Sequence, residues 1–70
     1  MDSIIGHNIK AQLKRRAMKQ ADVVRRSGVS KSYLSELISG KTTHPSVWTC
    51  AKIAEALQCS IDELVRIPKA

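Results

Sequence analysis

The stretch GVSKSYLSELISG, residues 28–40, places small hydrogen-bonding side chains at helical spacing between two glycines. On a helical wheel its apolar residues fall on one side. The opposite side is polar: it carries Ser32, Glu36 and Ser39, with Ser35 beside them and Lys31 and Tyr33 at the edges. Serine lets a helix backbone come close to the surface it faces, and a B-DNA major groove, about 12 Å wide, admits a helix. The pattern therefore predicts a helix that enters a groove.

The elements that must position this surface are two short helices joined by Gly28-Val29-Ser30. A helix over residues 20–27 is expected to stop at Gly28, because glycine is a natural stop just past a helix end. Ser30 is a good N-cap for the second helix, which ends at Gly40. This arrangement predicts a helix-turn-helix over about residues 20–39, in which the second helix is presented outward.

Helical periodicity recurs in the rest of the chain, whereas no stretch alternates for long enough to predict a strand. One further helix is expected over residues 4–18 and another from Pro45-Ser46 to residue 57. A last helix opens with SIDE, where Ser60 and Glu63 have the spacing of a capping box, and ends at Pro68. We predict a single compact all-α domain of five helices over residues 1–70. The residues expected to be buried are Ile5, Ile9, Leu13, Val23, Val24, Leu34, Leu37, Ile38, Val47, Cys50, Ala51, Ala54, Leu57, Ile61 and Leu64.

The charge balance indicates an anionic partner. The chain has 12 Lys and Arg residues against 6 Asp and Glu, a net charge of +6 and a pI near 9.8. Such a balance in a small domain favours nucleic acid or an anionic membrane surface. No apolar run approaches the ~20 residues of a spanning helix, and the first residues lack the pattern of a signal peptide. We therefore expect a cytoplasmic, nucleoid-associated protein with no membrane partner.

The residues that commonly carry catalysis or bind metals form no recognisable site. Cys50 and Cys59 are nine residues apart, which is ~13 Å along a helix and too far for a disulfide, so both are expected to be reduced and buried. His7 and His44 lack the close ligand spacing of zinc modules. The adjacent carboxylates Asp62-Glu63 belong to a helix cap. We expect no enzyme activity, cofactor, metal or small-molecule ligand.

A longer stretch, KQADVVRRSGVSKSYLSELISGKTTHPSVWTCAKIAEALQCSIDELVR, resembles the Cro and lambda-repressor type of helix-turn-helix domain, the XRE family. The likeness covers the chain from Ile5-Gly6 to Arg66. The residues that carry it are Gln20, the Gly-Val-Ser turn, Gly40-Lys41, Pro45-Ser46 and the segments AEAL and SIDEL. The resemblance implies a five-helix DNA-binding domain of a transcriptional regulator.

Some positions depart from the family pattern. Val24 stands where the family commonly has alanine, Lys19 where a Ser, Thr or Asn caps the second helix, and Gln58 where a Gly ends the fourth. Many relatives pair a buried Arg with a buried Glu at the positions of Leu13 and Ile38. Replacing both members of a buried ion pair with apolar residues is often neutral or stabilising. None of these changes lies on the predicted groove-facing surface.

Contacts to DNA are assigned by position on the two helices. Base edges are expected to be contacted by Lys31, Ser32, Tyr33 and Glu36. Phosphates are expected to be contacted by Gln20, Ser30, Ser35, Lys41, Thr42 and Thr43. The role of Gln20 is implied by the resemblance, because the family's residue at this position holds a phosphate at the start of the second helix.

Several of these residues have a plainer alternative. Lys31 could position the helix on a phosphate without reading a base. Glu36 could be a solvated side chain paired with Lys31 or Lys41, and Tyr33 could half-bury its ring against the second helix. Gln20 could be an ordinary surface residue, and residues 41–43 an ordinary polar loop.

Trp48 is expected to be exposed, because it lies opposite the Cys50, Ala51 and Ala54 side of its helix. Large exposed aromatic residues are enriched at protein interfaces. We therefore predict a dimer or partner interface at Trp48 and Lys52. The alternative is a tryptophan that lies over Lys52, one turn later, as a cation–π pair.

The sequence as a whole predicts a sequence-specific DNA-binding transcriptional regulator, a repressor that acts as a homodimer on a two-fold related operator with half-sites about 34 Å apart. A bacterial genome, a phage or a plasmid fits as its source. The alternative is an antitoxin-like or co-regulatory module that uses the same fold to bind another protein, which Trp48 favours. A third class is a basic amphipathic protein of membrane surfaces.

Overall fold

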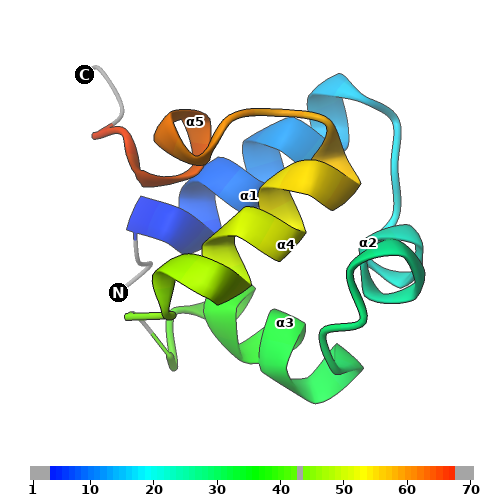
Figure 1. Ribbon diagram of the computed structural model, residues 1–70, viewed down its shortest axis with the longest axis horizontal. Coiled ribbons are helices and arrows are strands. Elements are labelled where there is room, and N and C mark those ends of the chain that lie inside the picture. The colour runs from blue at the N-terminus through cyan, green and yellow to red at the C-terminus, as the bar shows by residue number, and fades with distance from the viewer. Residues whose placement is uncertain (1–3, 43, 68–70) are drawn as a thin grey trace.

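The computed structural model describes residues 4–42 and 44–67, and this part of the chain forms five α-helices. They are α1 (Ile4–Arg15), α2 (Gln20–Ser27), α3 (Lys31–Ser39), α4 (Val47–Leu57) and α5 (Ile61–Val65). Figure 1 shows α4 crossing in front of α1, with α2, α3 and α5 around them. The predicted all-α, five-helix fold is confirmed, and the described residues contain no strand. Pro68 and Thr43 lie outside the described residues.

The core is apolar and draws on every helix. Helix α4 packs against α2 and α5, while α1 packs against α3 and α5. The largest fully buried side chains are Ile9, Val23, Leu34, Leu37, Ile53, Leu57 and Leu64. Burying each such side chain is worth about 1.5–3 kcal/mol. Leu13 and Ile38, where the resemblance implies an ion pair in many relatives, are also buried in this cluster.

The prediction that Val47 is buried is wrong, because its side chain is 61% exposed. Val47 and Trp48 form the exposed first turn of α4, and full burial begins only at Cys50. The wheel also missed Ile53, which is fully buried beside Ala54. The expected core residues that are half-buried instead are Val24, Ala51 and Ile61.

Helix α1 ends at Arg15, three residues before the predicted end. Ala17 has a φ of 53°, in the left-handed region, which turns the chain out of the helix. The Met18 N–H then donates to the Leu13 carbonyl at 2.9 Å, and Met18 packs against the core. A similar left-handed residue, Gln58 with φ 57°, closes α4.

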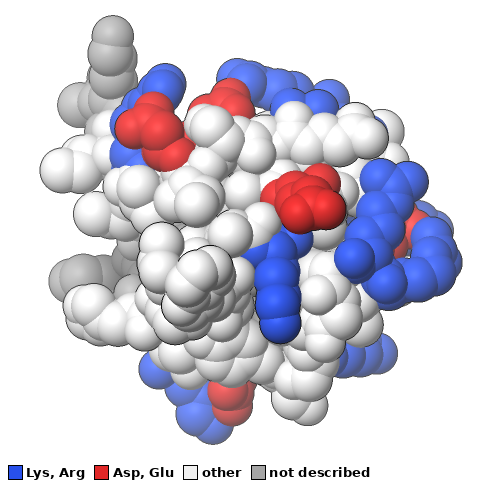
Figure 2. Space-filling model, in the orientation of Figure 1, with Lys and Arg blue, Asp and Glu red and all other residues white. Residues whose placement is uncertain are grey.

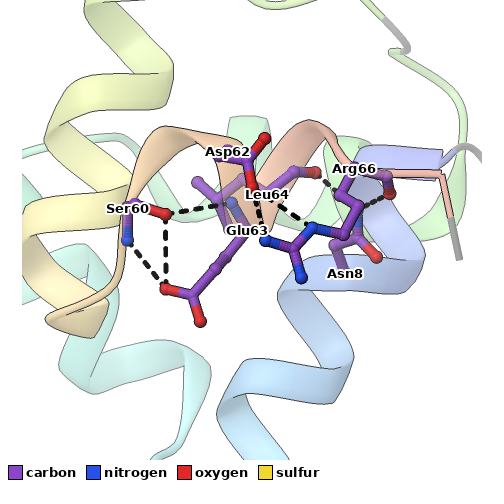
Figure 3. A network of polar contacts seen from close by, with 6 residues as sticks. All are labelled: Asn8, Ser60, Asp62, Glu63, Leu64 and Arg66. Carbon is purple, nitrogen blue, oxygen red and sulfur yellow. Dashed lines mark hydrogen bonds and ion pairs between the residues drawn. The ribbon is translucent and has the colours of Figure 1, made fainter.

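The short helix α5 is held by polar contacts at both ends (Figure 3). At its start Ser60 and Glu63 form the predicted capping box: the Ser60 N–H donates to Glu63 Oε2 at 2.9 Å, and the Glu63 N–H donates to Ser60 Oγ at 3.2 Å. At its end Asn8 Nδ2, from α1, donates to the carbonyls of Leu64 and Arg66 at 2.7 and 2.8 Å. The cap is encoded locally, whereas the contact from Asn8 joins residues more than fifty positions apart.

Both cysteines are free thiols; Cys50 is buried and Cys59 is half-buried. Burial raises the pKa of each thiol. The described residues include no cluster of three or more side chains that could hold a metal ion. None of the helices in residues 4–42 and 44–67 has the length and hydropathy needed to cross a membrane.

Candidate nucleic-acid interface

The turn between α2 and α3 is fixed by backbone conformation and by two serines. Gly28 has a φ of 77°, which a residue with a Cβ adopts only under strain, and its N–H donates to the Val24 carbonyl at 3.0 Å. The Val29 N–H donates to Ser27 Oγ at 3.1 Å. Ser30 caps α3, since its Oγ accepts from the Tyr33 N–H at 3.1 Å. The turn therefore sets the direction in which α3 leaves α2.

Helix α3 has a fully apolar inner side and a small polar outer side. Leu34, Leu37 and Ile38 are buried. The residues that are exposed are Lys31, Ser32, Ser35 and Ser39. Figure 1 shows α3 along the lower edge of the molecule. The helix thus presents lysine and serine outward, as the wheel predicts.

Tyr33 and Glu36 face outward less than the serines do. Tyr33 is half-buried and packs against the core, which agrees with the alternative that its ring lies partly against the protein. Glu36 Oε2 lies 3.8 Å from Lys41 Nζ, so the carboxylate has an exposed ionic partner inside the chain. An exposed pair at this distance is weak, and Glu36 can exchange it for another partner.

The start of α2 carries Gln20, which is exposed at the first helical position. Lys19 occupies the N-cap position, and its N–H donates to Asp22 Oδ2 at 3.0 Å. Arg25 forms an ion pair with the same carboxylate at 2.8 Å. The hydrogen bond from Lys19, followed by Arg25, lowers the pKa of Asp22. Sequence reasoning missed this Asp22–Arg25 pair, although the spacing of three residues in a helix is its signal.

The chain leaves α3 through Gly40, whose φ of 89° turns it sharply. The Thr42 N–H donates to the Glu36 carbonyl at 3.2 Å, which ties the start of this loop to the helix. Lys41 is exposed and Thr42 is half-buried. The predicted contact residues Lys41 and Thr42 therefore lie directly beyond the C-terminal end of α3.

The face of the molecule over α4 carries few charged side chains inside its rim. Figure 2 shows Lys and Arg side chains mostly around the rim of this face; a broad uncharged area lies inside the rim, beside one acidic and one basic side chain near the middle. Trp48 is 76% exposed, as predicted. Lys52 and Glu55 are the charged residues of α4, and neither forms an ion pair within the described part of the chain.

A family model described as helix-turn-helix matches residues 9–64, a span that contains α2, the turn, α3 and α4. The chain belongs to the XRE-type helix-turn-helix family.

Three relatives of this helix-turn-helix protein show the extent of the likeness. The chain is 38% identical over 61 residues to the HTH-type transcriptional regulator SlrR and 31% identical over 62 residues to SinR, both of Bacillus subtilis. These alignments cover 87% and 89% of the chain but 40% and 56% of those regulators. It is also 37% identical over 65 residues to the HTH-type transcriptional regulator y4dJ of Sinorhizobium fredii, with 93% of the chain and 83% of y4dJ covered. The chain thus spans about half the length of the two Bacillus regulators.

Proposed function

We propose that this helix-turn-helix protein is a DNA-binding transcriptional regulator that inserts α3 into the major groove. The observation that carries the proposal is the outer side of α3, where a lysine and serines are presented on a helix whose inner side is buried. The net charge of +6 supplies long-range attraction to DNA. The names of the relatives, HTH-type transcriptional regulators, agree with this function.

The exposure of each side chain suggests its role. Lys31 and Ser32, exposed in the first turn of α3, are the best-placed residues for base edges. Glu36 reaches a cytosine amino group if it leaves Lys41, and Tyr33 contributes only its outer edge. The proposed phosphate contacts are Gln20, Ser30, Ser35, Lys41, Thr42 and Thr43.

We further propose that the protein is a repressor that binds a two-fold related operator as a homodimer, with Trp48 and Lys52 at the interface. Trp48 and Val47 are exposed apolar side chains at the start of α4. Two copies that each carry +6 repel one another, so they are expected to meet where charge is sparse, as on the face over α4 (Figure 2).

Selection from a randomised DNA duplex pool at near-physiological salt tests this function. Selected sequences should contain an inverted repeat with half-sites about 34 Å apart. Lys31→Ala should cost about 1–3 kcal/mol of binding and relax the preference at one base pair. Lys14→Ala, an exposed lysine of α1, is the matched control and should leave the preferred sequence unchanged. If binding of the DNA pool disappears as salt is raised and no sequence is enriched, specific recognition is contradicted.

A second candidate function is binding to another protein, which the exposure of Trp48 favours. In that case Trp48→Ala would abolish capture of the partner while leaving DNA binding by the monomer intact. For the homodimer, the same variant should lower the sedimentation coefficient and weaken binding to a two-site operator more than to a half-site.

A further inference from the structure

A groove lined mostly by polar and charged residues lies between α1 and the C-terminal end of the described chain, away from the predicted DNA contacts. Its volume is about 260 Å³. The groove is lined on α1 by Asn8, Gln12 and Arg15, and on the other side by Glu63, Arg66 and Ile67. Figure 1 shows α5 and α3 on opposite edges of the molecule. A ligand in this groove would therefore leave the outer side of α3 free.

Gln12 supplies an unused hydrogen-bond donor to the groove. The residue is only 6% exposed, although it is polar. Its Oε1 accepts from Arg16 Nε at 3.3 Å, which identifies the other terminal atom as the amide nitrogen. That nitrogen has no partner within the described residues. No fully buried side-chain nitrogen or oxygen in that part of the chain lacks a partner, so the Gln12 nitrogen retains access to the groove that it lines.

Asn8 supplies an acceptor one helical turn before Gln12. Its Nδ2 is occupied by the carbonyls of Leu64 and Arg66 (Figure 3), which fixes the orientation of the amide. Its Oδ1 accepts no hydrogen bond from the described residues, although the residue is only 8% exposed. Side chains four residues apart on a helix have Cβ atoms about 5–6 Å apart. A donor and an acceptor at this spacing suit a side-chain carboxylate and a backbone N–H group of an extended peptide.

The charges beside the groove favour an acidic ligand. Arg15 is exposed and forms no salt bridge with the described residues. Arg66 is paired with Asp62, and the Glu63 carboxylate accepts the Ser60 N–H. Arg16, which donates a hydrogen bond to Gln12, is the third arginine near the groove. The three arginines outnumber the two carboxylates, Asp62 and Glu63, and both carboxylates already have partners. Guanidinium groups bind carboxylates with two parallel hydrogen bonds, so Arg15 is open to such a contact.

We propose that this groove binds an acidic segment of a partner protein in an extended conformation. Arg15 and the Gln12 amide nitrogen hold a side-chain carboxylate of the segment, while Asn8 Oδ1 accepts one of its backbone N–H groups. The site does not depend on the proposed DNA-binding function, since no residue of α2 or α3 lines the groove. A DNA-bound molecule could therefore still recruit such a partner.

Side-chain amide signals in an NMR titration of the ¹⁵N-labelled chain test the proposal. The sequence contains one Asn and three Gln residues, so its four NH₂ signals are those of Asn8, Gln12, Gln20 and Gln58. The probe is a blocked pentapeptide of alternating alanine and glutamate. The Gln12 signals should shift and saturate, whereas those of Gln20 and Gln58 should not move. The same peptide with glutamine in place of glutamate should bind at least about tenfold more weakly.

Variants separate the groove from general attraction to a basic protein. Arg15→Gln should lower the affinity for the peptide by about tenfold or more. Lys14→Gln removes the same charge from the adjacent exposed residue and should leave the affinity unchanged. Gln12→Leu should abolish binding while circular dichroism shows a folded helical domain. Equal losses in the two charge variants, or shifts at Gln20 and α3 without any at Gln12, would overturn the proposal. The selected DNA sequence should be the same for Arg15→Gln, which separates this site from DNA recognition.

Discussion

Replacing Asn8 with alanine measures how strongly the C-terminal helix is held to the domain. Asn8 Nδ2 is the donor to two carbonyls, those of Leu64 at 2.7 Å and Arg66 at 2.8 Å. Leaving a buried acceptor without its donor costs about 1–3 kcal/mol. The Leu64 contact is buried and the Arg66 contact is part-buried, so water can compensate at the second carbonyl. The two together should cost about 2–4 kcal/mol.

That loss is large for a chain of this size. A 70-residue domain is stabilised by about 3.5–10 kcal/mol in total. Because Leu64 is fully buried and belongs to α5, release of the end of α5 also weakens its packing against α1 and α4. The Asn8→Ala domain should therefore unfold at a markedly lower denaturant concentration, and the amide protons of α5 should exchange first.

The measurement is guanidinium denaturation followed by circular dichroism, together with hydrogen exchange of individual amides. His7→Ala is the control, because His7 is the exposed neighbour of Asn8 on α1. The control should change the free energy of unfolding by no more than about 0.5 kcal/mol. If Asn8→Ala has an equally small effect, the two hydrogen bonds do not hold α5, and the reasoning is refuted.

Three other predictions follow from local geometry. Ala17→Gly should stabilise the domain by about 1 kcal/mol in thermal or chemical denaturation, because φ at this position is 53°; an unchanged midpoint would contradict the strain. Gly28→Ala should destabilise it by about 1–2 kcal/mol through the same penalty at φ 77°, and not through a clash, since no atom beyond the two neighbouring residues lies within 4 Å of the added Cβ. The pKa of Glu63 is lowered mainly by the hydrogen bond from the Ser60 N–H. The stability that the cap contributes is therefore fully present above the pKa of Glu63 in the unfolded chain, and it is lost as pH falls through the lower pKa of Glu63 in the folded chain. In the Glu63→Gln variant the free energy of unfolding should fall less steeply as the pH is lowered. The same steepness as in the unchanged chain would argue against the cap.

The parts of this fold that depend on neighbouring residues could be predicted from the sequence. Ser30, Ser46 and Ser60 each accept a backbone N–H three residues later and so begin α3, α4 and α5. Gly28 and Gly40 end α2 and α3 with positive φ. A cap or a stop acts within one helical turn, so residue type and spacing were sufficient. The outward serines of α3 follow for the same reason, because the wheel alone decides which side is opposite the leucines.

The remaining features were decided by contacts between distant segments. Periodicity assigned Val47 to the core, yet the first turn of α4 is exposed, and only the packing of the other helices determines where along α4 burial begins. Tyr33 is partly drawn into the core, which the wheel left open. Asn8 is a buried polar residue whose partners, the carbonyls of Leu64 and Arg66, are brought to it only because α5 folds back onto α1. A sequence pattern reports the side of a helix, whereas the tertiary structure decides what covers that side and what is left accessible to a ligand.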